Sequence, residues 1–136
     1  MLFGTNSGTN FLQMVVWRIM LPGIVASAIA ADSLGYHSVA RLIIEQQLSP
    51  GAIARLFAMS ASPDAGHVAA VVILAAATAR FNSCRENFSG DLERDLAIKA
   101  LGGETGFAAA NKQAVKLVQH HWTEITANAV HSSAWR

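Results

Sequence analysis

The sequence predicts an all-α protein, a single compact domain of five to seven helices. Alanine, leucine, isoleucine and valine dominate the chain, and no segment alternates apolar and polar residues as a half-buried strand does. No Asn-Gly or Asp-Gly pair marks a tight hairpin turn. Each of the three prolines stands where a helix would begin or end. These three observations favour helices throughout and one domain over residues 1–136.

Length and composition narrow the class of protein. The chain has 136 residues, enough for one domain with its own core. Apolar residues make up 52% and charged residues 14%, a balance that excludes an intrinsically disordered chain. The net charge of +1 argues against a nucleic-acid partner, and the single cysteine, Cys84, excludes a disulfide framework. So little charge indicates that another subunit covers part of the apolar surface.

Cap residues, prolines and glycines divide the chain into helices. Ser49-Pro50 and Ser62-Pro63-Asp64 each place a capping side chain before a proline, which is typical of a helix start. Gly102-Gly103 is expected to end a helix, and Pro22-Gly23 to break or kink one. The expected helices cover residues 10–21, 24–31, 33–48, 50–59, 63–81, 90–101 and 105–130. Residues 131–136 are expected to form a frayed tail.

Two apolar stripes with helical spacing predict how the last helices pack. One stripe lies on the helix of residues 90–101 and the other on the helix of residues 105–130. We expect the two to face each other, with the indole of Trp122 buried between them. Their members are Leu92, Leu96 and Ala100 on one helix and Leu117, Val118, Trp122 and Ile125 on the other.

The stretch from Phe11 to Ala30 is the most apolar part of the chain and belongs to an apolar helical segment over residues 1–31. Three interpretations compete: a core or subunit-interface helix, a membrane anchor over residues 11–30, and a secretory signal. Arg18 disfavours a membrane-spanning helix, because a charge near its middle is costly. No basic residue precedes Arg18, which disfavours a signal peptide. We therefore favour a core or interface helix and a cytoplasmic protein.

Four side chains are candidates for a zinc site: His37, His67, Asp91 and His121. Histidine and carboxylate groups are common zinc ligands, and histidine is the side chain most often used for acid–base chemistry. For each of these side chains, the competing interpretation is an ordinary structural role. His67 and Asp91 fall in the first turns of their helices, and His121 borders a core-facing stripe. No glycine-rich phosphate loop and no intact His-Glu-x-x-His motif accompanies them.

The segment Ile73–Phe81, followed by a loop and by Ser89-Gly90-Asp91-Leu92-Glu93-Arg94, resembles the peptidase domain of FtsH-type zinc metalloproteases. The resemblance extends weakly over residues 36–129. It implies a helical domain in which Asp91 takes the place of the third zinc ligand. The His-Glu-x-x-His helix of that family corresponds to His37-Ser38-Val39-Ala40-Arg41, so a serine replaces the base and an arginine the second ligand.

A second match to the family's motif, Pro63-Asp64-Ala65-Gly66-His67, keeps only one histidine and lies too close to Asp91 for the family's layout. Zinc hydrolysis needs three protein ligands and a positioned base, and neither match supplies both. The resemblance therefore implies a degenerate metallopeptidase domain without catalytic residues.

The sequence favours a non-catalytic helical protein that acts through protein–protein contacts, with a protein partner or further copies of itself. No cofactor is expected. Zinc would be bound only under the first alternative, in which the chain is a divergent zinc metallopeptidase. The second alternative is a small membrane-associated subunit anchored by residues 11–30. The aromatic side chains that are candidates for the interface are Phe11, Trp17, Phe107 and Trp135, with Trp122 as a further one.

Overall fold

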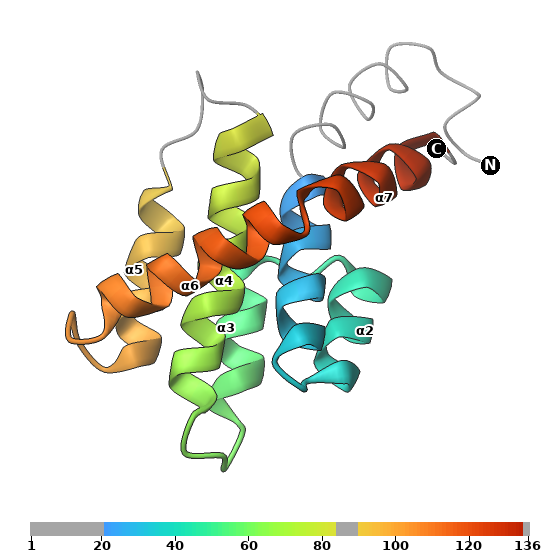
Figure 1. Ribbon diagram of the computed structural model, residues 1–136. Coiled ribbons are helices and arrows are strands. Elements are labelled where there is room, and N and C mark those ends of the chain that lie inside the picture. Colours follow the sequence, from blue (N-terminus) through green and yellow to red (C-terminus); the bar gives the residue numbers. More distant parts are fainter. Residues whose placement is uncertain (1–20, 84–89, 135–136) are drawn as a thin grey trace.

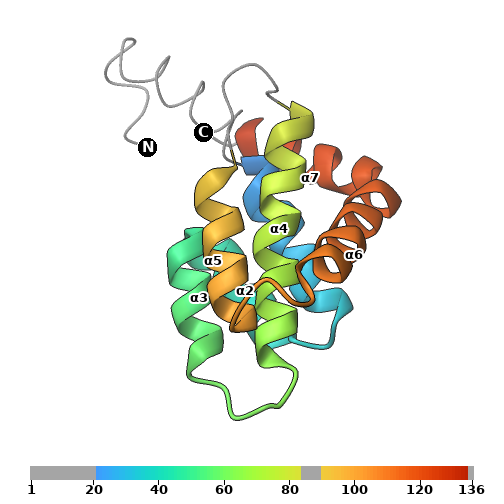
Figure 2. The ribbon, with the colours of Figure 1, turned by 90° about the vertical axis from the view of Figure 1, so that its left-hand side faces the viewer.

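The protein is built around one central helix, α4 (Ala65–Ser83), whose side chains are buried on all sides. The computed structural model describes residues 21–83 and 90–134. These residues form helices and no strand, which confirms the all-α prediction. Figure 2 shows α3 (Pro50–Ala58) and α5 (Asp91–Leu101) on one side of α4 and α6 (Phe107–His120) on the other.

The remaining helices complete the cover of α4. A helix over Leu21–Ser33 lies beside α4 in Figure 1, and α2 (His37–Gln46) follows it on the side away from α4. The hydroxyl of Ser27 donates a buried hydrogen bond of 2.8 Å to the carbonyl of Val72, which joins the Leu21–Ser33 helix to α4. The last helix, α7 (Trp122–Ala134), follows α6 after a bend. A helix that is apolar all round must be buried, and these neighbours bury α4.

Local signals in the sequence explain most of the helix ends. The hydroxyl of Ser49 accepts a hydrogen bond of 3.2 Å from the amide of Ala52, and Pro50 occupies the first turn of α3. The carboxyl end of α5 is closed by Gly102, whose φ of +80° is the left-handed conformation that glycine adopts without strain. The predicted starts and ends of α3 and α5 agree with the structure within about two residues.

Two predicted helices differ from the structure. Pro22 and Gly23 lie in the first turn of the Leu21–Ser33 helix, while residues 10–20, on the other side of the expected break, lie outside the described residues. The helix expected over residues 33–48 begins only at His37, because the chain turns at Gly35 with a φ of +92°. The long helix expected over residues 105–130 is two helices, separated by His121, and the second of them continues to Ala134 into the expected tail.

The predicted contact between the two apolar stripes is also wrong. Leu92 is 63% exposed, and Trp122 is only half-buried at the junction of α6 and α7. The side chains that α5 buries are Glu93 and Ala97, one position away from the predicted stripe. Helix α5 is therefore rotated so that it packs on α4 and α3, with little contact to α6.

The apolar segments form the core wherever the structure describes them. Residues 21–30, the described half of the expected apolar stretch, contribute Leu21, Val25 and Ala26 to the core; residues 11–20 lie outside the described residues. Within the described residues, α4 alone is long and apolar enough to cross a membrane, and 61% of its most apolar stretch is buried in the protein. Burial to this extent is typical of the core helix of a folded domain.

Candidate functional site

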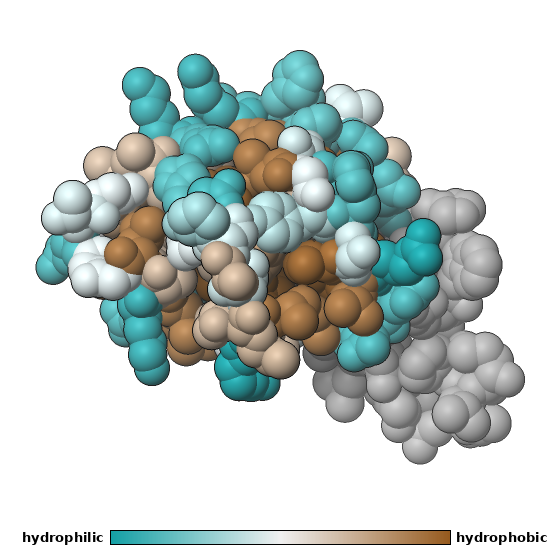
Figure 3. Space-filling view, turned by 90° about the horizontal axis from the view of Figure 1, so that it is seen from below, coloured by the Kyte–Doolittle hydropathy of each residue, from teal (hydrophilic) through white to brown (hydrophobic). Residues whose placement is uncertain are grey.

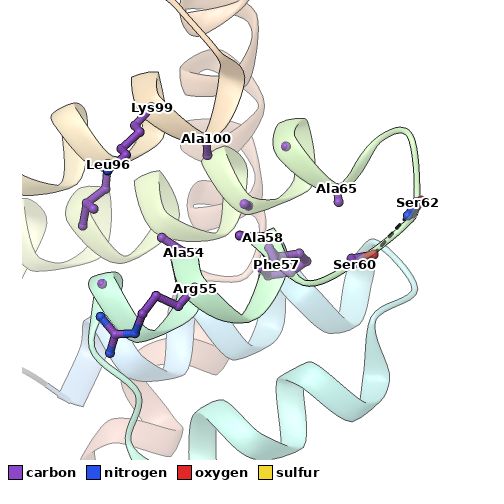
Figure 4. A pocket seen from close by; sticks show the side chains of 13 residues that line it. Ala54, Arg55, Phe57, Ala58, Ser60, Ser62, Ala65, Leu96, Lys99 and Ala100 are labelled. Carbon is purple, nitrogen blue, oxygen red and sulfur yellow. Dashed lines mark hydrogen bonds between the residues drawn. The ribbon is translucent and has the colours of Figure 1, made fainter.

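A groove opens between α3 and α5, above the first turns of α4 (Figure 4). Its volume is about 660 Å³, within the range of about 300–1,000 Å³ that is usual for small-molecule sites. Helix α3 forms one wall, α5 the other wall, and the start of α4 the floor. The lining residues are Gly51, Ala54, Arg55, Phe57, Ala58, Ser60, Ser62, Ala65, Gly66, Ala69, Leu96, Lys99 and Ala100.

The groove exists because small residues meet where three helices come together. Glycine at position 66 allows α4 and α5 to approach closely, since a Cβ atom there would lie 2.5 Å from the carbonyl oxygen of Ala100. Ala54 and Ala58 on α3 are too short to reach across the remaining space (Figure 4). The ring of Phe57 and the methyl group of Ala69 are buried beneath it. The floor is therefore apolar and well packed, while the groove itself stays open.

The charged groups of the groove are all cationic. Arg55 stands on the α3 wall and Lys99 on the α5 wall, both exposed to solvent. No aspartate or glutamate lines the groove. Within residues 21–83 and 90–134, neither cation forms an ion pair. The groove therefore carries two positively charged side chains on its walls, above an apolar floor.

A hydrogen-bonded turn fixes the end of the groove where α3 leads into α4. The amide of Ser62 donates to the hydroxyl of Ser60 over 3.2 Å (Figure 4), and the hydroxyl of Ser62 donates to the carboxylate of Asp64. The hydroxyl of Tyr36 donates to the same carboxylate over 3.2 Å. The hydrogen bond from the hydroxyl of Ser62 lowers the pKa of Asp64 from its ordinary value, and the hydrogen bond from Tyr36 adds to this effect.

The structure does not bring the four candidate zinc ligands together. The imidazole of His67 on α4 lies 2.8 Å from the side-chain oxygen of Gln113 on α6, and that of His121 lies 3.0 Å from Glu124. His37 contacts Asp32 near the start of α2, whereas Asp91 begins α5 at the opposite end of the bundle (Figure 1). Over the described ranges, no three histidine, cysteine or acidic side chains are close enough to hold a metal ion.

Of the aromatic side chains proposed as interface anchors, the structure describes two. Phe107 begins α6 half-buried against the core, with the guanidinium of Arg94 5.7 Å from the centre of its ring. Trp122 is half-buried as well. Phe11, Trp17 and Trp135 lie outside the described residues.

One buried ionic contact was missed by the sequence analysis. Arg80, in the last turns of α4, donates a hydrogen bond to the carboxylate of Glu93 on α5, and Glu93 is only 2% exposed. The aliphatic part of Arg80 lies against Gly23, where a Cβ atom would come within 2.8 Å of it. An arginine near the end of a long and largely apolar helix is the sequence signal that could have predicted a buried acidic partner.

Comparison with known proteins finds no family model, no curated protein and no solved structure that matches this chain.

Proposed function

We propose that the chain is a non-catalytic helical protein that acts through protein–protein contacts, and that a second copy of the chain is its first partner. The observation that carries this proposal is the exposed apolar surface where α4 ends and α5 begins. Leu92 is 63% exposed and Phe81 48% exposed, and the two helices pack side by side, so both residues lie at the same end of the pair (Figure 1).

Composition supports contact between identical chains. The net charge of +1 gives little electrostatic repulsion between two copies. Elsewhere, Ile44 on α2 and Met59 after α3 are also exposed, and the end of the molecule opposite to Phe81 and Leu92 shows apolar areas among hydrophilic ones (Figure 3). Apolar side chains that are exposed in one chain become buried when an interface forms.

Sedimentation velocity at micromolar concentration tests the proposal. We expect the wild-type chain to sediment as a dimer and Leu92→Asp to sediment as a monomer, because an aspartate at this position would be buried without a partner in the interface. Ala108→Asp places the same acid at an exposed first-turn position of α6 and should leave the dimer intact. A wild-type chain that is monomeric at every concentration, or a Leu92→Asp variant that remains dimeric, would contradict the proposal.

We further infer that the chain is a degenerate relative of the FtsH-type peptidase domain. His37 and Arg41 lie four residues apart in sequence on α2, the spacing of two metal ligands on one helix face. Arg41 is exposed and always positively charged, so it repels a metal cation at the position where a second histidine would bind one. Ser38 lacks the carboxylate that would act as the base.

Thermal melting with zinc and with chelator tests this second point on the wild type and on Asp91→Asn. We expect each protein to melt at the same temperature under both conditions. A zinc-dependent rise in the wild-type melting temperature that disappears in Asp91→Asn would support a divergent zinc metallopeptidase instead, since a bound ligand stabilises the folded state.

A further inference from the structure

The shape of the groove between α3 and α5 limits what it can bind. Helices α3 and α5 contact each other as well as α4, so the groove is bounded by all three helices. From Gly51 to Ala58 the α3 wall is roughly 10 Å long, at 1.5 Å per residue. A volume of about 660 Å³ along this wall is the size of a small-molecule site and suits a ligand with a short hydrocarbon chain.

The chemistry of the groove specifies two parts of such a ligand. The floor of alanine and glycine residues, with the half-buried side chain of Leu96, offers apolar contacts along its length and favours a hydrocarbon chain. Arg55 and Lys99, one on each wall, offer hydrogen-bond donors of positive charge to an anionic group. The absence of any acidic side chain from the lining disfavours a cationic head group.

We propose that this groove binds a fatty acid, with the hydrocarbon chain over the floor formed by α4 and the carboxylate held by Arg55 or Lys99. This site lies beside the first turns of α4, at the opposite end of that helix from Phe81 and Leu92. Fatty-acid binding and self-association therefore use separate surfaces, and either one can fail without the other.

Isothermal titration calorimetry with dodecanoate, kept below its micelle-forming concentration, tests the proposal. We expect saturable binding of one dodecanoate per chain and much weaker binding of dodecyltrimethylammonium, which has the same chain and the opposite charge. The double variant R55Q/K99Q should bind dodecanoate about tenfold more weakly or worse, because it loses the charge-assisted hydrogen bonds. The matched control R41Q/K112Q neutralises two exposed cations away from the groove and should bind as the wild type does.

A variant whose larger side chain fills the groove provides a second, independent test of fatty-acid binding. Ala58→Phe adds a ring at an exposed position on the groove wall and should abolish dodecanoate binding while its melting temperature stays close to that of the wild type. Ala109→Phe, at an exposed position on α6, is the matched control and should leave binding unchanged. No saturable binding by the wild type, or equal binding by all variants, would overturn the proposal. Binding to anionic vesicles that needs Arg55 and Lys99, without binding of free dodecanoate, would also overturn it and assign the groove to a membrane surface.

Discussion

The two sides of α4 are packed in different ways. On one side, α6 buries Ala110, Ala114 and Val118, which are spaced four residues apart and therefore follow one face of the helix. On the other side, α3 and α5 share the surface of α4 and leave a groove of about 660 Å³ between them. Small side chains are abundant on both sides, so the abundance of alanine alone does not decide whether a contact is closed or open.

The difference arises from how many helices meet. Where only two helices meet, small residues on one face let them pack at close range, as α6 does where it crosses α4 (Figure 1). Where three helices meet, Gly66 lets α5 approach α4, and the short side chains of Ala54 and Ala58 on α3 cannot fill the space that remains. The same residue type therefore stabilises the contact with α6 and leaves an open groove beside α3.

The largest predicted effect concerns the ionic contact on the α5 side. Glu93→Ala removes the buried carboxylate that accepts the hydrogen bond of Arg80, and the loss of a hydrogen bond to a charged group costs about 1.5–3 kcal/mol. Urea denaturation measures this loss in the free energy of unfolding. Asp95→Ala removes an exposed acid from the same helix and should change stability by less than about 0.5 kcal/mol. Equal losses in the two variants would show that the buried pair does not hold α5 on α4.

The next prediction compares the two sides directly by enlarging one alanine on each. Ala114→Leu inserts a large side chain into the closed contact between α6 and α4 and should cost about 1–3 kcal/mol through overpacking. Ala58→Leu makes the same change on the wall of the groove, where space is available, and should cost less than about 0.5 kcal/mol. Thermal melting of the two variants measures both effects. A loss at Ala58→Leu as large as that at Ala114→Leu would mean that the groove is closed in solution.

Residues near the groove also show what the sequence could predict. The start of α3 follows from Ser49 and Pro50, and the end of α5 from Gly102, because these residues act on their own backbone. The direction in which α5 faces was not predictable in this way. Leu92 and Leu96 suggest one buried face, but the structure buries Glu93, because its partner Arg80 lies on another helix.

No local signal in the sequence marks the break at His121 or the groove. Neither glycine nor proline stands at the end of α6, where it separates from α7. Each alanine that lines the groove is an ordinary helix residue in the sequence. Its role depends on the distance to the facing helix, and the sequence pattern contains no information on that distance.

A smaller effect is expected for the glycine that allows α4 and α5 to approach. Gly66→Ala places a Cβ atom 2.5 Å from the carbonyl oxygen of Ala100, so the two helices must separate. We expect this separation to cost roughly 1–3 kcal/mol. The better helix propensity of alanine offsets about 1 kcal/mol of that cost. Gly51→Ala is the matched control on α3, since its Cβ atom would meet the guanidinium of Arg55 at an ordinary 3.7 Å. We expect a lower melting temperature for Gly66→Ala and an unchanged or higher one for Gly51→Ala. The reverse order would contradict the close approach of α4 and α5.

The smallest effect is a pH dependence at the turn that closes the groove. The hydrogen bond from Ser62 lowers the pKa of Asp64 in the folded state, so the ionised carboxylate stabilises the fold above the unfolded pKa of about 3.9. This contribution disappears as the pH falls through the lowered pKa of the folded state. We therefore expect the wild type to melt above Asp64→Asn at pH 7 and the difference to shrink below about pH 4. Ser62→Ala removes the main cause of the shift and should show a weaker acid dependence than the wild type. A difference between wild type and Asp64→Asn that stays constant from neutral to strongly acidic pH would show that this carboxylate does not stabilise the turn through its charge.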